Sequence, residues 1–147
     1  MAQSVRRTTF WSSIGGLLVA CVAFAVVLLL ANAILYLLNW IRGAENSWLE
    51  TAFRELASPA AGAYAAMLVV HKIFKAYSKN FVFFGFSALI IAFVAASLTL
   101  MFVVWGSGRF SVYDAIMQGL AAPVAIAGAY CAYKNETNEQ EPGPTKP

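Results

Sequence analysis

The residues of this 147-residue chain that could do chemistry are few, and most are weakly polar. Within its long apolar stretches, the polar side chains are hydroxyls and amides: Asn32, Ser58, Tyr64, Ser87, Ser97, Thr99, Gln118 and Tyr130. No Asp, Glu, Lys, Arg or His lies deep inside such a stretch. Charged groups there usually mark proton relays or ion-coupling sites, so we do not expect a proton-coupled antiporter.

The candidates for metal or redox chemistry stand far apart in the sequence. His71 is the single histidine, and no second ligand lies near it at metal-binding spacing. Cys21 and Cys131 do not form a Cys-x-x-Cys pair. A glycine-rich phosphate loop and a Ser/His/Asp set are also missing from the sequence. We therefore expect a protein that is not an enzyme and that needs neither a metal nor a cofactor.

One segment occurs twice. Residues 47–64, SWLETAFRELASPAAGAY, align without a gap with residues 111–128, SVYDAIMQGLAAPVAIAG. The matched positions include Ser47 with Ser111, Glu50 with Asp114, Leu56 with Leu120, and Pro59 with Pro123. A repeat of this kind fixes the architecture, so we interpret the chain as two related halves.

Both copies predict the same local structure. Ser-x-x-Glu and Ser-x-x-Asp are typical helix starts, because the hydroxyl and the acid satisfy free amide hydrogens of the first turn. Pro59 and Pro123 each remove a backbone hydrogen bond and predict a kink. The hydroxyl of Ser58 is expected to bond carbonyl groups freed at the first kink. Alanines at four-residue spacing form one row in each copy: Ala57, Ala61 and Ala65, then Ala121, Ala125 and Ala129. Such rows allow close helix packing in lipid, and we expect both to pack inside an oligomer-forming unit.

The composition indicates a membrane protein. Hydrophobic residues make up 61% of the chain and charged residues 12%, whereas soluble domains carry about 25% charged residues. Four stretches reach the roughly 20 residues that span a bilayer: 14–41, 56–76, 81–105 and 112–133. We predict an all-α membrane protein of four transmembrane helices in two tandem hairpins. The first stretch is too long for the apolar part of a signal peptide.

The distribution of Lys and Arg predicts the orientation. The predicted cytosolic positions are Arg6, Arg7, His71, Lys72, Lys75, Lys79 and Lys134, and the opposite side is poorer in basic residues. By the positive-inside rule, both termini face the cytosol and the protein lies in the cell inner (plasma) membrane. The residues His71, Lys72, Lys75 and Lys79 are expected to meet lipid headgroups or a cytosolic protein, and we expect no nucleic acid to bind.

The remaining segments are short. Residues 1–13 form a basic cytosolic head, residues 45–55 an amphipathic segment on the outer side, and residues 134–147 a polar tail that predicts disorder. Glu50 and Arg54 are spaced to pair on a helix. Asn32 is expected to bond either across a helix interface or to its own backbone.

Several functions fit these features. The first is a non-enzymatic homo-oligomer that acts as a membrane scaffold or as a pore-forming component with a cytosolic partner, as in toxin or defence systems. The second is an uncoupled carrier or channel for a neutral or apolar solute. Its predicted site lies beside the kinks at Ser58, Pro59, Tyr64, Gln118, Pro123 and Tyr130. The third is a passive anchor subunit of a larger membrane complex.

Overall fold

The computed structural model describes residues 2–42, 48–74, 76–105 and 112–140, and every regular element in these ranges is a helix. The elements are α1 (Ala2–Arg42), α2 (Trp48–Ala52), the π-helical segment η1 (Phe53–Ala57), α3 (Ser58–Ile73), α4 (Lys79–Trp105) and α5 (Val112–Gln140). Four stretches are long and apolar enough to cross a membrane: Thr9–Ile41, Glu50–Ile73, Lys79–Val103 and Val112–Asn135. The prediction of an all-helical chain with four candidate spans is therefore confirmed.

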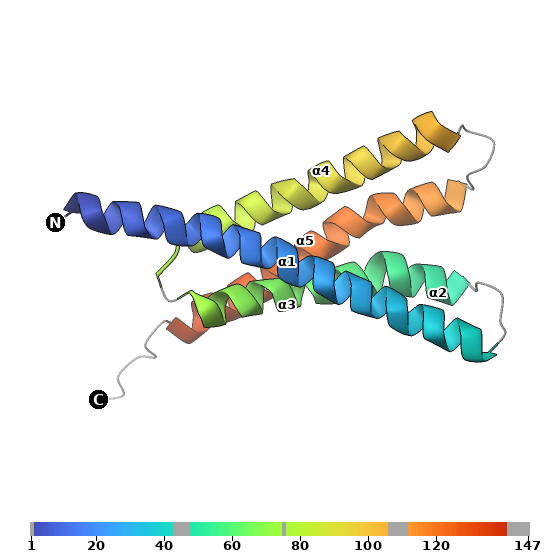
Figure 1. Cartoon of the computed structure of the whole chain (residues 1–147), viewed down its shortest axis with the longest axis horizontal. Helices are drawn as coiled ribbons and strands as arrows, with labels where there is room; N and C mark the ends of the chain where they lie inside the picture. Colours follow the sequence, from blue (N-terminus) through green and yellow to red (C-terminus); the bar gives the residue numbers. More distant parts are fainter. Residues whose placement is uncertain (1, 43–47, 75, 106–111, 141–147) are drawn as a thin grey trace.

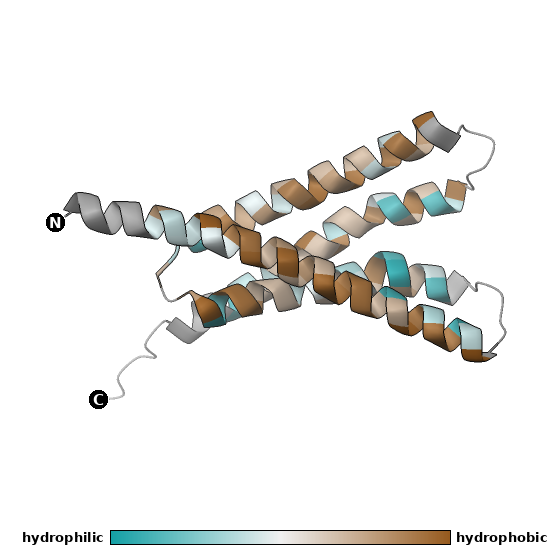
Figure 2. Ribbon diagram, in the orientation of Figure 1, coloured by the Kyte–Doolittle hydropathy of each residue, from teal (hydrophilic) through white to brown (hydrophobic). Residues whose placement is uncertain are grey.

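The helices form two antiparallel pairs that cross (Figure 1). Helix α1 packs against α3, α4 packs against α5, and the pairs meet mainly where α3 lies against α5. We call the end with Glu50, Glu55 and Asp114 the acidic end, and the end with His71, Lys72 and Lys79 the basic end. Figure 2 shows hydrophilic residues on α2, η1 and the start of α5, at the acidic end.

Helix α1 is longer than a bilayer requires. Its apolar part covers 33 residues, or about 50 Å at 1.5 Å per residue, against a hydrocarbon thickness of about 30 Å. A helix with this excess can fit a bilayer by tilting. Accordingly, α1 crosses the other helices obliquely in Figure 1.

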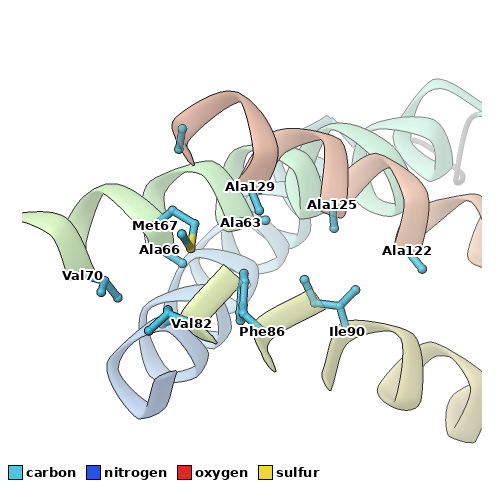
Figure 3. Packing of buried hydrophobic residues seen from close by; sticks show 12 residues of the cluster. Ala63, Ala66, Met67, Val70, Val82, Phe86, Ile90, Ala122, Ala125 and Ala129 are labelled. Atoms are coloured by element: carbon cyan, nitrogen blue, oxygen red, sulfur yellow. The ribbon is translucent and has the colours of Figure 1, made fainter. Parts of the chain in front are cut away.

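The packed core lies toward the basic end. Figure 3 shows Met67 and Val70 of α3 beside Val82 and Phe86 of α4, with Ala129 of α5 closing the cluster. The rings of Phe24 and Phe86 pack edge to face, with their centroids 5.6 Å apart, and connect α1 to α4. Near the same end, the Ser13 hydroxyl accepts a 2.9 Å hydrogen bond from the Ser78 amide and donates one to the Thr9 carbonyl.

The closest approach of backbones is between α3 and α5. A Cβ atom at Gly128 would collide with the carbonyl oxygen of Ala60, so only glycine fits here. Small residues at such a crossing let helices in lipid gain packing energy that bulky side chains would prevent.

The helix ends differ from the predicted segment limits. Helix α1 begins at Ala2, so the predicted head is helical, and α5 continues to Gln140, so residues 134–140 of the predicted disordered tail are helical. Extending a formed helix by one residue is easy compared with starting one, which accounts for both extensions. Ser47, Ser111 and Lys75 lie outside the described residues, whereas Glu50 and Asp114 lie in the first turns of α2 and α5.

Candidate functional site: a cavity among the helices

A cavity of about 190 Å³ lies among the helices toward the acidic end. Residues from α1, η1, α3, α4 and α5 all contribute to its wall: Phe24, Leu28, Asn32, Arg54, Glu55, Pro59, Ile90, Phe93, Val94, Ser97, Gln118, Ala121 and Ala125. A water molecule occupies about 30 Å³ in the liquid, so the cavity holds several waters or one small solute.

Two neighbouring pockets lie nearer the acidic end and share wall residues with this cavity. One, of about 240 Å³, lies among Thr51, Arg54, Glu55, Met101, Asp114 and Gln118. The other, of about 480 Å³, lies between α1 and the α2–η1 segment and includes Asn39, Glu50 and Arg54. Arg54 borders all three spaces, so we describe them together as the vestibule.

The polar wall of the cavity joins α4 to α5. The Gln118 Nε2 group donates a 2.6 Å hydrogen bond to the Ser97 hydroxyl. The Oε1 atom of the same Gln118 is buried, and no described residue partners it. A buried acceptor without a partner is costly, so this oxygen is suited to water or to a donor on a bound solute.

The charged groups that line the vestibule have partners. Arg54 Nε lies 2.9 Å from Glu55 Oε1 in an ion pair, and the Asn39 amide donates a 3.0 Å hydrogen bond to Glu50 Oε2. Asp114, in the first turn of α5, lines the neighbouring pocket and also makes an interaction of its own. In the wall of the 190 Å³ cavity the charges of Arg54 and Glu55 neutralise each other.

The first repeat proline explains the local shape of this wall. Pro59 has no amide hydrogen and its ring crowds the carbonyl four residues earlier. The preceding turn is π-helical, and the Ser58 amide bonds the Phe53 carbonyl five residues back. This wider turn carries Arg54 and Glu55, which line the cavity beside Pro59. Single π-helical turns occur often at functional sites.

The cavity ends where the core begins. Ile90 and Ala125 line the cavity and also belong to the buried core, which continues toward the basic end through Phe86, Ala129 and Met67. The packed core therefore borders the cavity on the side of the basic end.

The predicted solute site is only partly brought together. Gln118 and Pro59 line the cavity, whereas Tyr64 packs against the core and Pro123 is exposed. Tyr130 is exposed in an aromatic group with Phe83 and Tyr133. Ser58 is buried, but its hydroxyl has no partner among the described residues, so the predicted bond to a freed carbonyl is not present there.

The two alanine rows have different surroundings, contrary to prediction. Ala121, Ala125 and Ala129 are buried, but Ala57 and Ala61 are exposed and Ala65 is half-buried. Helix α3 instead buries the face that carries Gly62, Ala63, Ala66 and Met67. Since α3 lies between α1 and α5, its neighbours and not the alanine spacing decide which face is covered. The predicted inward packing of the first row is therefore wrong within one chain, while its role in an oligomer stays a prediction.

Sequence reasoning missed other features of this site. It paired Arg54 with Glu50, whereas the ion pair joins Arg54 to its neighbour Glu55. It left Ser97 out of the predicted solute site, although Ser97 is the partner of Gln118. Asn32 bonds the Leu28 carbonyl of its own helix, which is one of the two predicted outcomes. At the basic end, Lys72 is exposed and His71 and Lys79 are half-buried.

No group of three metal-ligating side chains occurs among the described residues. Comparisons with known proteins give no match. No protein family, curated protein or solved structure is significantly similar to this chain. The arguments for function therefore rest on the geometry of the vestibule.

Proposed function

We propose that this protein is a small carrier or uncoupled channel that takes up a solute through the vestibule at the acidic end. The single observation that carries the proposal is a cavity with a few polar groups that is bordered by all four apolar helices, with a packed core on one side and further pockets toward the acidic end on the other. Solute sites in membrane proteins commonly lie inside a helical bundle, where irregular backbone is tolerated because it lines a cavity.

The positive-inside rule assigns the basic end to the cytosol and the vestibule to the outer side of a plasma membrane. In this arrangement the solute enters the vestibule from outside, and the packed core blocks its passage toward the cytosol. Passage to the other side then requires the two helix pairs to move where α3 crosses α5. Gly128 lies against the backbone of Ala60 at this crossing.

The test is solute flux into liposomes that contain only the purified protein. Vesicles in isosmotic urea, glycerol or ethanolammonium chloride swell when the solute enters, and stopped-flow light scattering follows the swelling. We expect faster swelling than in protein-free vesicles for at least one of these solutes. Swelling that is no faster than in protein-free vesicles for any of the three solutes would contradict the proposal.

A matched pair of variants connects flux to the cavity. Gln118→Met keeps the side-chain length but removes the amide that lines the cavity, so it is expected to change the rate. Thr99→Val removes a hydroxyl that is exposed on α4 and bonds its own helix at Ala95, so it is expected to leave the rate unchanged.

A second function, self-assembly into a scaffold or pore, is favoured by the exposure of Ala57 and Ala61. Small residues on an outward face allow a second copy to approach closely in lipid. Cross-linking in native membranes tests this function. Ala61→Leu is expected to lower the oligomer yield, whereas Ala96→Leu, at an exposed alanine of α4, is the control. An unchanged yield in Ala61→Leu would contradict it.

A further inference from the structure

The cavity wall carries a side-chain amide whose hydrogen-bonding groups are not all used. Gln118 has two N–H donors, and one of them bonds the Ser97 hydroxyl at 2.6 Å. Its Oε1 atom is buried and has no partner among the described residues. Gln118 therefore offers both an acceptor and a donor to a molecule in the cavity.

The charges in the wall of the same cavity cancel. Arg54 and Glu55 form an ion pair at 2.9 Å. The other polar residues of the wall are uncharged: Asn32, Ser97 and Gln118. Bringing a net charge into a space among apolar helices is costly unless it meets a group of opposite charge. The wall therefore favours a neutral solute over an ammonium or a carboxylate.

The size and the apolar part of the wall limit the solute further. The volume of about 190 Å³ is below the range of about 300–1,000 Å³ that is usual for drug-sized ligands. Much of the wall is hydrocarbon, including Phe24, Ile90 and Phe93. A solute with several hydroxyl groups would bury some of them against these side chains without partners, which is costly. A small molecule with one polar group and a short apolar part fits better.

We infer that the cavity binds a short-chain primary amide through the amide of Gln118. A primary amide carries a carbonyl acceptor and N–H donors on one carbon, so it complements the Oε1 atom and the second N–H of Gln118. A half-turn of the Gln118 amide exchanges its oxygen and nitrogen, and a primary amide matches both arrangements. The alkyl part of the solute then lies against the hydrocarbon wall. This inference rests on the proposed function and names the class of solute that the vestibule takes up.

The test is nuclear magnetic resonance of the full chain in phosphatidylcholine nanodiscs, with nitrogen-15 in the side chains of glutamine. The chain has three glutamines, and Gln3 and Gln140 lie near the start of α1 and at the end of α5. The variant Gln118→Met assigns the signal of Gln118. On titration with acetamide we expect this signal to shift saturably and the other two to remain in place. No saturable shift of Gln118, or equal shifts of all three signals, would overturn the inference.

Three molecules of nearly the same shape as acetamide examine its recognition. Acetone lacks the N–H donors, acetamidinium is a cation without a carbonyl oxygen, and acetate is an anion without N–H donors. We expect each of them to bind at least about tenfold more weakly than acetamide. Equal affinity for acetone would contradict recognition of the amide, and equal affinity for either ion would contradict a neutral site.

A pair of α5 variants ties the signal to the cavity. Ala121→Val takes up space in the cavity wall and is expected to weaken acetamide binding about tenfold. Ala127→Val, at an exposed alanine of the same helix, is expected to leave the affinity unchanged. Unchanged affinity in Ala121→Val would overturn the inference. The comparison of acetamide with the other three molecules needs no substitution, so it tests the inference even where a variant folds poorly.

This outcome is separable from that of the proposed function. Flux of a solute without a saturable shift of Gln118 would remove the amide as the solute and leave the transport proposal standing. A saturable shift without flux of any solute would support the amide site and contradict transport.

Discussion

The two copies of the predicted repeat have similar sequences and different positions in the fold. Pro59 is buried, lines the cavity and follows a π-helical turn, whereas its counterpart Pro123 is exposed within α5. The α5 alanine at 125 is 1% exposed, but the α3 alanine at 61 is exposed. The copies therefore bury different faces, because α3 lies between α1 and α5 while α5 lies between α3 and α4.

This difference also separates two tasks within the molecule. The first copy supplies the π-helical turn and the charged pair of the cavity wall, and the second copy supplies Gln118 and the small residues that allow close packing. The two aligned segments thus both line the cavity, but the first shapes its wall with the π-helical turn and the second supplies the glycine of the close helix crossing. The predictions below test this difference.

The largest effect is expected where α5 approaches α3. Gly128→Ala places a Cβ atom against the Ala60 carbonyl and should destabilise the protein by about 1–3 kcal/mol, the usual cost of overpacking. Gly119→Ala, at an α5 glycine with open space around it, should instead stabilise its helix by up to about 1 kcal/mol. Unfolding in mixed micelles measures the free energy of unfolding of both variants. Similar changes in the two variants would contradict the close contact between Gly128 and the Ala60 carbonyl.

The next comparison uses aligned alanines. Ala125→Leu overfills a buried position and should cost about 1–3 kcal/mol, whereas Ala61→Leu should change the unfolding free energy of the isolated chain by less than about 0.5 kcal/mol. The same assay measures the free energy of unfolding of these two variants. Equal losses would show that both rows pack inside the chain, as the sequence predicted.

The aligned prolines test the role of the π-helical turn. Pro59→Ala restores an amide hydrogen, so the turn can become α-helical and move Arg54 and Glu55 in the cavity wall. We expect the swelling rate of liposomes to change in Pro59→Ala and to remain unchanged in Pro123→Ala. A change confined to Pro123→Ala would reverse the roles of the two copies.

The smallest effect is expected for the ion pair. Glu55→Gln removes the partner of Arg54, but the two side chains are 46% and 24% exposed, so solvent weakens their attraction. The unfolding free energy should fall by less than about 1 kcal/mol. A larger loss would mean that the ion pair is a main contributor to the stability of the fold.

The sequence predicted where the helices lie along the chain better than which face of each helix is buried. Runs of apolar residues mark the four candidate spans because crossing a bilayer demands length and hydrophobicity, which are local properties. The surroundings of Ala61 depend on which helices lie beside α3, and this is a property of the whole bundle. The spacing of small residues could not distinguish the buried face with Ala63 and Ala66 from the exposed one.

The site was predicted in part for the same reason. Gln118 and Pro59 were identified because an amide or a proline is unusual in an apolar helix. The partnership of Gln118 with Ser97 joins two helices, and no spacing within either helix indicates it. The pairing of Arg54 with Glu55 follows from the π-helical turn, which replaces the helical geometry on which the predicted Glu50–Arg54 pair depended.

The most direct measurement of the central claim is cysteine accessibility across the membrane. In a chain whose Cys21 and Cys131 are replaced by Ser, single cysteines at Ser97, Gln118 and Ala63 are treated with a membrane-impermeant maleimide from each side. We predict labelling of Ser97→Cys and Gln118→Cys only from the side of the acidic end, and no labelling of Ala63→Cys from either side. Protection of both cavity positions, or their labelling from the side of the basic end, would contradict a vestibule that opens at the acidic end.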